Sequence, residues 1–367
     1  MSLTLSSIRL VNFRNYEEFS LEDLGNLTIM VGPNAVGKTN VIEAIQLVTA
    51  ISSFRNPRVE HLIRDGSEFG RLVAQIGDDQ RQLEIQMMMS EGKKKYLLNG
   101  KPKKINALKG ICPAVVFTPD DLDLVKGSNS IRRDALDAIG GQISENHRII
   151  KRDFSTVITN KKKLLKEDAR EDIISALDEV LLTCSSHLTC YRVALFNRLS
   201  EYLSYAYARI SSAKETVTCR YIPSWEEFGI FTEGKLTCEE AKNKLFQALV
   251  AAKPQERIRK RCLIGAHADK VSFLIDGKDA NLFASQGQQR CLVLAFKIAE
   301  VGVIRDILGT QPVLLLDDVM SELDSKRREC LVDFIKEEMQ VFITTTNLEY
   351  FEPTLLGRAR VVQLETN

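Results

Sequence analysis

The sequence predicts an α/β fold in which helices cover both faces of a largely parallel sheet. Three observations lead to this prediction. An apolar run at 27–31 precedes a glycine-rich turn and a helical pattern; the continuous apolar run PVLLLDD at 312–318 precedes a second helical pattern and VFITTT at 341–346; and a charged helical stretch lies between these regions. Continuous apolar strands that alternate with helices are typical of covered parallel sheets.

The first part of the chain should be rich in β-structure. Strands are expected at 3–13, 27–31, 71–76, 82–89 and 94–98. The helix after the glycine-rich turn should run through Val48. Asn99-Gly100 is a dipeptide favoured in type I′ turns, so it should join KKYLL to KPKKI as a hairpin.

The middle of the chain should form a helical arm. From Asp120 to about Ala213 the pattern is helical and charged, but it has no sustained heptad repeat. The segment 214–240 is mixed, and its Trp225 is expected to be a packing residue. Asp276-Gly277 predicts a second hairpin, and an apolar helix should follow at about 286–304.

Both ends of the chain are therefore expected to build one split head, from residues 1–118 and 255–367, around an arm of residues 119–254. The length of 367 residues agrees with two to three domains at roughly 150 residues each.

Composition limits the class of protein. A hydrophobic share of 44% and a charged share of 27% are typical of globular proteins. The longest apolar runs have about six residues, far below the roughly 18 of a membrane span, and the N-terminus does not resemble a signal peptide. We expect a cytoplasmic protein with free thiols, because the eight cysteines form no CxxC pair. The net charge of +1 does not by itself indicate a nucleic-acid or membrane partner.

The turn after 27–31 fits G-x-x-x-x-G-K-[ST] between a strand and a helix, the context that a phosphate-binding loop requires. Backbone N–H groups and the helix N-terminus would surround phosphate, Lys38 would neutralise β/γ oxygens, and Thr39 would bind Mg²⁺. The alternative is a glycine turn with an exposed lysine. The expected nucleotide-contacting residues are Gly32, Pro33, Asn34, Ala35, Val36, Gly37, Lys38, Thr39 and Asn40.

Two acids, Asp317 and Asp318, end the run PVLLLDD. Ligands of open α/β sheets bind at the carboxyl ends of the strands. In phosphoryl-transfer sites of this type the first acid holds Mg²⁺ and the next can orient the attacking water. Catalytic roles are expected for Lys38, Asp317 and Asp318, with ATP and Mg²⁺ as cofactors. The alternative is a pair of acids that cap the next helix.

A third motif, SQGQQR, starts at Ser285 and opens a helix. Serine at a helix start can help to bind an anion, but it is also an ordinary N-cap residue. Taken alone, the motif favours the N-cap.

Four motifs, GPNAVGKTN, ASQGQQR, LLLDDVMSELD and FITTTN, occur in an order that resembles the RecF family of SMC-like ABC-type ATPases. VNFRNY, SSFRNPRVEHLIRDG and VVFTPDDLDLVKGSNSIRRDALD are also similar, so the resemblance covers roughly residues 3–362. It implies an ABC-type P-loop ATPase head, with mixed and parallel sheets, plus a helical arm. The chain is too short between its motifs for a long coiled coil.

The resemblance implies a head-to-tail homodimer that holds two ATP molecules between its subunits. Ser285, Gly287 and Gln288 would approach the γ-phosphate bound by the partner, and the segment from Ser321 to Asp324 would be the D-loop at the dimer seam. Asp318 stands where other ABC proteins carry a glutamate, and its shorter reach favours slow hydrolysis. Thr346 stands where many carry the switch histidine.

The function implied by the resemblance is an ATP-dependent DNA-binding clamp of recombinational repair. ATP would close the dimer on duplex or gapped DNA, and the protein would assist RecA loading with RecR and RecO. One alternative is the ATPase subunit of an SMC-like DNA break-processing complex; another is a scaffold with a degenerate nucleotide site. The absence of a membrane span disfavours a transporter ATPase.

Three features depart from the family pattern. Ala35 occupies a loop position that usually holds glycine, and GAHADK at 265–270 has Ala268 and Lys270 in place of an arginine and a second acid. No glutamine aligns with the Mg²⁺-contacting Q-loop, whose expected neighbourhood is VVFTPDD.

Basic clusters recur despite the neutral total, and each alone is more often a solvated surface. A local stripe is nevertheless sufficient for sequence-independent, salt-sensitive contact with DNA phosphates. The clusters are Lys93–Lys95, Lys101, Lys103, Lys104, Arg132, Arg133, Arg148, Lys151, Arg152, Lys161–Lys163, Arg257 and Arg259–Arg261.

Overall fold

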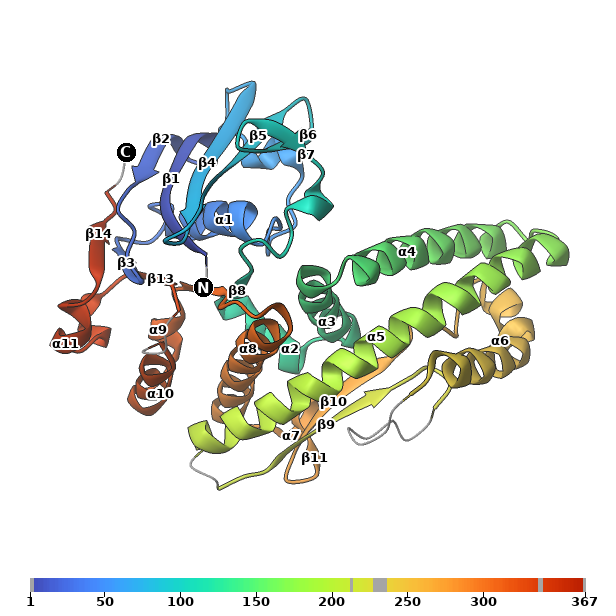
Figure 1. Ribbon diagram of the computed structural model, residues 1–367. Helices are drawn as coiled ribbons and strands as arrows, with labels where there is room; N and C mark the ends of the chain where they lie inside the picture. Colours follow the sequence, from blue (N-terminus) through green and yellow to red (C-terminus); the bar gives the residue numbers. More distant parts are fainter. Residues whose placement is uncertain (1–2, 212–213, 227–235, 336–338, 366–367) are drawn as a thin grey trace. The chain divides into compact units, whose positions relative to one another are not determined.

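A computed structural model of the chain describes residues 3–211, 214–226, 236–335 and 339–365. The chain forms two compact units, the first from residues 1–121 and 300–367 and the second from residues 122–299. In Figure 1 the first unit combines strands in blue and red, so both ends of the chain build it.

The parallel sheet of the first unit has the order β14-β3-β13-β12-β8. Its strands are β14 (Arg360–Gln363), β3 (Leu27–Val31), β13 (Val341–Thr345), β12 (Val313–Asp317) and β8 (Ala114–Phe117). Every neighbouring pair is parallel, as the apolar runs predicted. The three central strands are buried at every residue, which explains why their sequences do not alternate. Strand β14, which the sequence did not predict, extends the sheet beyond β3.

A second, antiparallel sheet has the order β2-β1-β4-β5-β6-β7. Its strands are β1 (Thr4–Phe13), β2 (Tyr16–Leu21), β4 (Phe69–Gly77), β5 (Gln82–Ser90), β6 (Lys93–Leu98) and β7 (Lys101–Lys103). Asn99 and Gly100 have φ values of 50° and 73°, so the predicted type I′ turn is confirmed. One apolar core joins this sheet to helix α1 (Lys38–Thr49) and to the parallel sheet. Strand β2 was missed.

The remaining elements of the first unit are short. The helices are α9 (Val319–Glu322), α10 (Ser325–Ile335) and α11 (Pro353–Leu356). The 3₁₀ turns are Val59–Leu62, Ile105–Ala107, Pro119–Leu122 and Leu348–Tyr350. The turn Ile105–Ala107 precedes β8, and the last residue of Pro119–Leu122 already belongs to the second unit.

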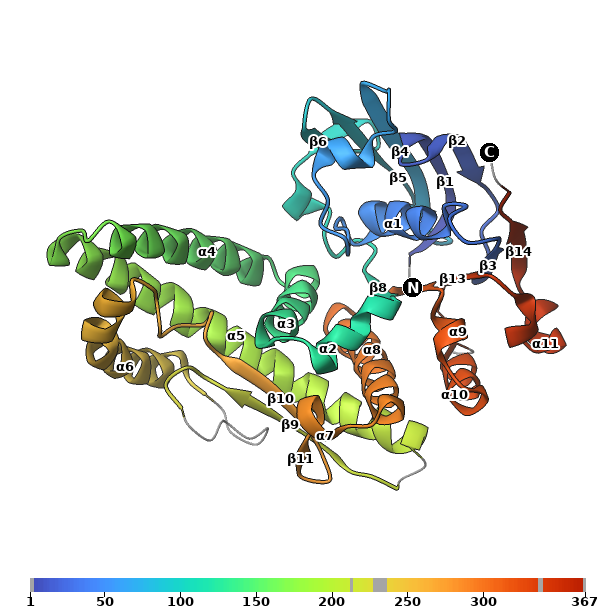
Figure 2. The same ribbon diagram turned by 180° about the vertical axis from the view of Figure 1, so that it is seen from behind.

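The second unit is helical with a small sheet. Its helices are α2 (Asp123–Lys126), α3 (Asn129–Ile143), α4 (Glu145–Lys166), α5 (Glu171–Ser211), α6 (Cys238–Arg259) and α7 (Ala280–Phe283). Figure 2 shows α4 lying along α5, and α6 packs on α5 as well. Trp225 packs against the apolar core of these helices, as expected. Among the described residues, no helix is long and apolar enough to cross a membrane.

The second unit is larger than the predicted arm of 119–254, because residues 255–299 also belong to it. The physical reason is strand pairing over a long distance in sequence. Strand β10 (Lys270–Ile275) lies antiparallel between β9 (Val217–Ile222) and β11 (Lys278–Asp279). Helix α8 (Gln286–Leu308) starts in this unit and continues into the first.

Candidate ATP site

The phosphate-binding loop connects the end of β3 to the start of α1. The Lys38 ammonium lies across the loop and donates to the backbone oxygens of Gly32 (2.6 Å) and Pro33 (2.9 Å). Burial lowers the pKa of Lys38, while Asp318 and Asp317 act in the opposite direction. The loop therefore holds a lysine ready to exchange two neutral oxygens for phosphate oxygens.

The two glycines of the motif are required by close contacts. A Cβ on Gly32 would lie 2.7 Å from the carbonyl oxygen of Leu364. Gly37 has a φ of +112°, and a Cβ there would lie 2.6 Å from the Asn15 side-chain amide. A side chain at position 32 would collide with the backbone of Leu364, and one at position 37 would strain the loop backbone and collide with Asn15.

The rest of the loop explains one departure from the family pattern. Ala35 adopts a φ of 66°, in the left-handed region that glycine occupies without strain. Pro33, Asn34 and Ala35 are exposed and Val36 is buried. The departure from glycine at this position therefore places a strained alanine in the loop.

Asp317 lies at the end of β12 and receives two hydroxyl hydrogen bonds. Thr39 Oγ1 donates to Asp317 Oδ1 at 3.1 Å, and Thr344 Oγ1 donates to the same oxygen at 2.7 Å. Burial raises the pKa of Asp317, and these hydrogen bonds oppose the rise. Thr39 and Asp317, which the sequence placed 278 positions apart as magnesium ligands, are therefore in direct contact.

Asp318 has a different environment. Its backbone is left-handed, with a φ of 53°, and Oδ1 is buried without a hydrogen-bond partner in the described part of the chain. Burial raises the pKa of this carboxyl, whereas Lys38 lowers it. An unsatisfied carboxylate oxygen beside the phosphate lysine is suited to accept a hydrogen bond from a ligand or water.

These residues fit ATP with Mg²⁺. Hydroxyl and carboxylate oxygens are the ligands that Mg²⁺ prefers, and Thr39 and Asp317 supply one of each at contact distance. The loop supplies N–H groups at the start of a twelve-residue helix.

Sequence reasoning missed the buried acid Glu43 and the side chains that bind it near the loop. Glu43 is fully buried and accepts hydrogen bonds from Arg14 (2.9 Å to Nε), Ser53 (2.6 Å) and Arg55 (3.4 Å). Arg55 also lies near enough to Asp317 to lower its pKa. The cation beside the acid pair could not be recognised from spacing, because Arg55 lies in a loop without a regular pattern.

Thr344 and Asn15 are the other two contacts that the sequence did not reveal. Thr344 faces Asp317 across adjacent parallel strands, where the two residues are register partners. Asn15 donates to the backbone oxygen of Val36 (3.1 Å) and accepts from Asn40 (2.7 Å). The first contact follows from strand pairing and the second from the turn between β1 and β2, and local sequence patterns encode neither.

The SQGQQR motif lies in the second unit. Ser285 Oγ accepts from the backbone N–H of Gln288 at 3.2 Å, and Gln288 Oε1 accepts from the N–H of Ser285 at 2.7 Å. The N-cap interpretation of Ser285 is therefore confirmed, as a reciprocal capping box. Ser285 is also exposed, and Gly287 is partly exposed, so the helix start is open to a ligand.

The expected D-loop follows the acid pair in the first unit. Ser321 Oγ donates to the backbone oxygen of Asp318 at 2.8 Å. Asp324 accepts from the backbone N–H of Arg327 at 2.9 Å, at the start of α10. Thr346 is exposed just after β13. The VVFTPDD segment ends β8, beside β12, and contains no glutamine.

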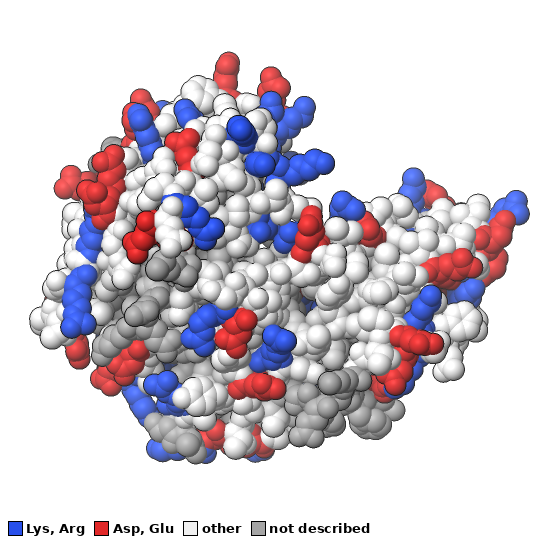
Figure 3. Space-filling view, viewed as in Figure 1, with Lys and Arg blue, Asp and Glu red and all other residues white. Residues whose placement is uncertain are grey.

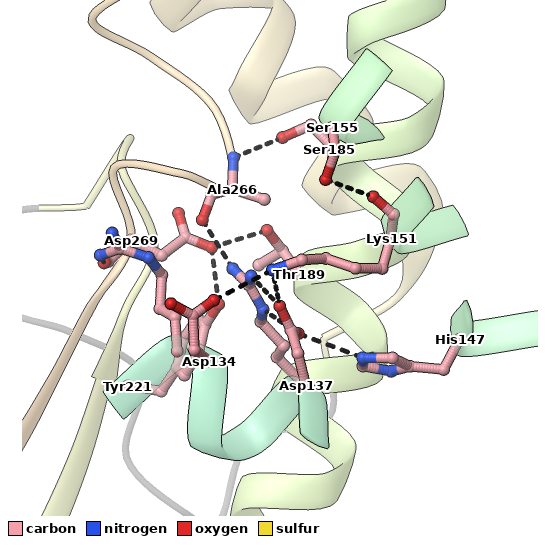
Figure 4. A network of polar contacts seen from close by, with 12 residues as sticks. Asp134, Asp137, His147, Lys151, Ser155, Ser185, Thr189, Tyr221, Ala266 and Asp269 are labelled. Atoms are coloured by element: carbon pink, nitrogen blue, oxygen red, sulfur yellow. Dashed lines mark hydrogen bonds and ion pairs between the residues drawn. The ribbon is translucent and has the colours of Figure 1, made fainter. Parts of the chain in front are cut away.

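GAHADK forms part of a buried polar network in the second unit, shown in Figure 4. Asp269 accepts from Thr189 Oγ1 (2.8 Å), Tyr221 Oη (2.6 Å) and the backbone N–H of Ser224 (2.8 Å). Asp269 therefore ties α5 to β9, while the substituted neighbours Ala268 and Lys270 are not needed for this contact.

Residues 4–363 match the family described as RecF/RecN/SMC N terminal domain. The chain is 32% identical over 368 residues to the DNA replication and repair protein RecF of Lactobacillus delbrueckii subsp. bulgaricus, which covers 99% of this chain and 96% of that protein. It is 35% identical over 350 residues to the protein of the same name from Symbiobacterium thermophilum, and this match covers 94% of this chain and 92% of that protein.

Solved structures agree with these relatives. The chain superposes on the recombination mediator protein RecF-ATPrS in RecFOR pathway with a TM-score of 0.87 and 28% identity, covering 96% of this chain and 94% of that one. An Smc head domain from Pyrococcus furiosus shares the fold at a TM-score of 0.54 and 15% identity, with 100% and 94% covered. The resemblance expected from the motifs is confirmed, and the chain belongs to the RecF family of SMC-like ABC-type ATPases.

Proposed function

We propose that this protein is an ATP-dependent DNA-binding clamp that acts in recombinational repair. The observation that supports the proposal most is the direct contact between Thr39 and Asp317 beside Lys38, which brings the two expected Mg²⁺ ligands together next to the expected phosphate-binding lysine. In this proposal ATP drives homodimerisation on duplex or gapped DNA, hydrolysis is slow and stimulated by DNA, and the protein assists RecA loading with RecR and RecO.

Each residue of the site has a chemical task. Lys38, which now donates to the oxygens of Gly32 and Pro33, would neutralise phosphate charge, and Thr39 and Asp317 would hold a Mg²⁺ ion. Bound Mg²⁺ would neutralise the charge that develops on the phosphate oxygens. Asp318 orients the attacking water through its unpartnered Oδ1. Its side chain is one methylene shorter than that of glutamate, which is consistent with slow turnover.

The composite site needs a second subunit. Ser285, Gly287 and Gln288 open a helix whose N-terminus is accessible, and a helix N-terminus favours anions. We infer that these residues meet the γ-phosphate bound by the partner, with Ser321 to Asp324 and Thr346 near the seam.

The DNA contact that we favour in the first unit is a lysine surface on β6 and β7. Figure 3 shows basic side chains gathered at this end of the unit. Lys93, Lys95, Lys101, Lys103 and Lys104 are exposed there. Lys94, Lys95, Lys103 and Lys104 line an open pocket of about 570 Å³ together with Tyr96 and Ile105. Concentrated positive charge of this kind supports phosphate binding that is independent of sequence.

Two variants test the proposal. Lys38→Met should abolish ATP binding and ATP-dependent dimerisation, because the cation that neutralises the phosphates is lost. Ser285→Arg should keep nucleotide binding but block dimerisation and turnover, because the long arginine side chain would occupy the space in front of the helix N-terminus. ATP-dependent dimers of Lys38→Met, or normal turnover by Ser285→Arg, would contradict the proposal. An assay for Mg²⁺- or Mn²⁺-dependent DNA cleavage should be negative; cleavage would favour the break-processing alternative.

A further inference from the structure

The amide of Gln288 is held by a carboxylate from a distant part of the chain. Gln288 Nε2 donates to Glu215 Oε1 at 2.9 Å, and the second carboxylate oxygen accepts from Tyr207 Oη at 2.6 Å. Tyr207 is fully buried on α5, and Glu215 lies just before β9. A continuous chain of hydrogen bonds thus links the SQGQQR motif to the long helix of the arm.

These hydrogen bonds fix which way the Gln288 amide points. A carboxylate can only accept, so Glu215 must face Nε2, and the N–H of Ser285 then faces Oε1. One N–H of Nε2 is committed to Glu215, and the other makes no hydrogen bond with the described residues, so it is available to a ligand. Without Glu215 the amide would be held only by the N–H of Ser285, so its N–H groups would be less firmly directed toward a phosphate.

Glu215 is itself held by α5 and β9, which are tied together at both ends. Near Glu215, Ser204 Oγ on α5 donates to the backbone oxygen of Val217 at 3.1 Å. At the other end of β9, Tyr221 and Thr189 both donate to the buried Asp269. Displacement of α5 would therefore move Glu215 and with it the orientation of Gln288.

We propose that Glu215 is a positioning residue for the composite ATP site: it orients the Gln288 amide toward the γ-phosphate and makes that orientation depend on arm helix α5. This inference rests on the proposed function, since it assumes that Gln288 meets ATP bound by the partner. It assigns to the arm a direct influence on turnover, beyond any contact that the arm makes with DNA.

Glu215→Gln tests the inference, because an amide at 215 can accept from only one of its two partners. The turnover number should fall about tenfold, the loss expected for one hydrogen bond to a charged group. The ATP affinity of the monomer should remain as in the wild type, since Lys38 and its loop are unchanged. Tyr207→Phe keeps the Glu215 carboxylate but removes the hydrogen bond from Tyr207 that holds it, so turnover should fall to a lesser extent.

Glu201→Gln is the matched control, because Glu201 is exposed on the same helix α5 and its loss removes the same charge. Hydrogen exchange gives a second readout that needs no dimer. In Glu215→Gln the first turn of α8 should exchange faster than in the wild type, whereas β12 should be unchanged.

The outcomes separate the two proposals. If the wild type forms no dimer with ATP, the proposed function fails, and the exchange of α8 still decides whether Glu215 holds Gln288. If the wild type dimerises and the folded Glu215→Gln protein keeps wild-type turnover, the positioning role is overturned. The positioning role would also be overturned if Tyr207→Phe had the turnover of the wild type and if hydrogen exchange at the start of α8 were unchanged in both Glu215→Gln and Tyr207→Phe.

Discussion

Replacement of Arg192 by methionine should destabilise the second unit by about 4 kcal/mol. Its guanidinium is 1% exposed and donates through Nε and Nη2 to Asp137, both at 2.8 Å, and through Nη1 to the backbone oxygen of Ala266 at 2.6 Å. Burial alone would raise the pKa of Asp137, but the hydrogen bonds from Arg192 and His147 outweigh it and hold that pKa far below its usual range.

The magnitude follows from what remains after the substitution. Loss of one partner from a buried ion pair costs about 3–5 kcal/mol. His147 and Lys151 still contact Asp137, so the lower end applies, about 3 kcal/mol. The unpaired carbonyl of Ala266 adds about 1 kcal/mol.

Urea unfolding followed by circular dichroism and by hydrogen exchange measures this loss for each unit separately. Arg192→Met with Asp137→Asn should recover about 2 kcal/mol relative to Arg192→Met, because the double variant no longer buries a carboxylate that has lost its buried guanidinium partner. Arg170→Met, which removes an exposed pair with Asp172, should cost less than about 0.5 kcal/mol. A loss below about 1 kcal/mol for Arg192→Met would show that the buried ion pair contributes little to stability.

Three further predictions follow. Ala35→Gly should raise the free energy of unfolding by up to about 1 kcal/mol in thermal melts, because it relieves a left-handed alanine, and a decrease would contradict the strain. Burial lowers the pKa of His267 to about 4, so protonation of the unfolded chain should reduce stability by about 2 kcal/mol between pH 7.5 and pH 5. His267→Gln should flatten that dependence, and an unchanged slope would contradict it. Joint replacement of Lys103 and Lys104 by glutamate should weaken duplex binding and lower the salt slope by about 2, and an unchanged slope would exclude this surface.

Local patterns predicted the core of the ATP site. Glycine spacing and the strand before it identified the loop, and an apolar run that ends in acids identified Asp317 and Asp318, because each pattern lies within about ten consecutive residues. The parallel sheet followed from the same runs. Strands β2 and β14 were missed because they are short and partly exposed, with little apolar signal.

Long-range pairing accounts for what the sequence did not reveal. Strand β10 belongs to the second unit because Val271 pairs with Tyr221, fifty positions earlier in the chain, and this shifts the boundary from the predicted 254 to 299. The contacts of Glu43 with Arg55 and of Gln288 with Glu215 have the same origin. Only the three-dimensional structure brings these residues together, because a motif that contains one partner does not show which residue it contacts elsewhere in the chain.

Sedimentation of the protein with and without ATP and duplex DNA, alongside Lys38→Met, tests the central claim most directly. We expect a monomer without nucleotide, a dimer bound to duplex when ATP and Mg²⁺ are present, and a monomer of Lys38→Met under every condition. A wild-type protein that remains monomeric with ATP and DNA, or a Lys38→Met protein that dimerises with ATP, would contradict it.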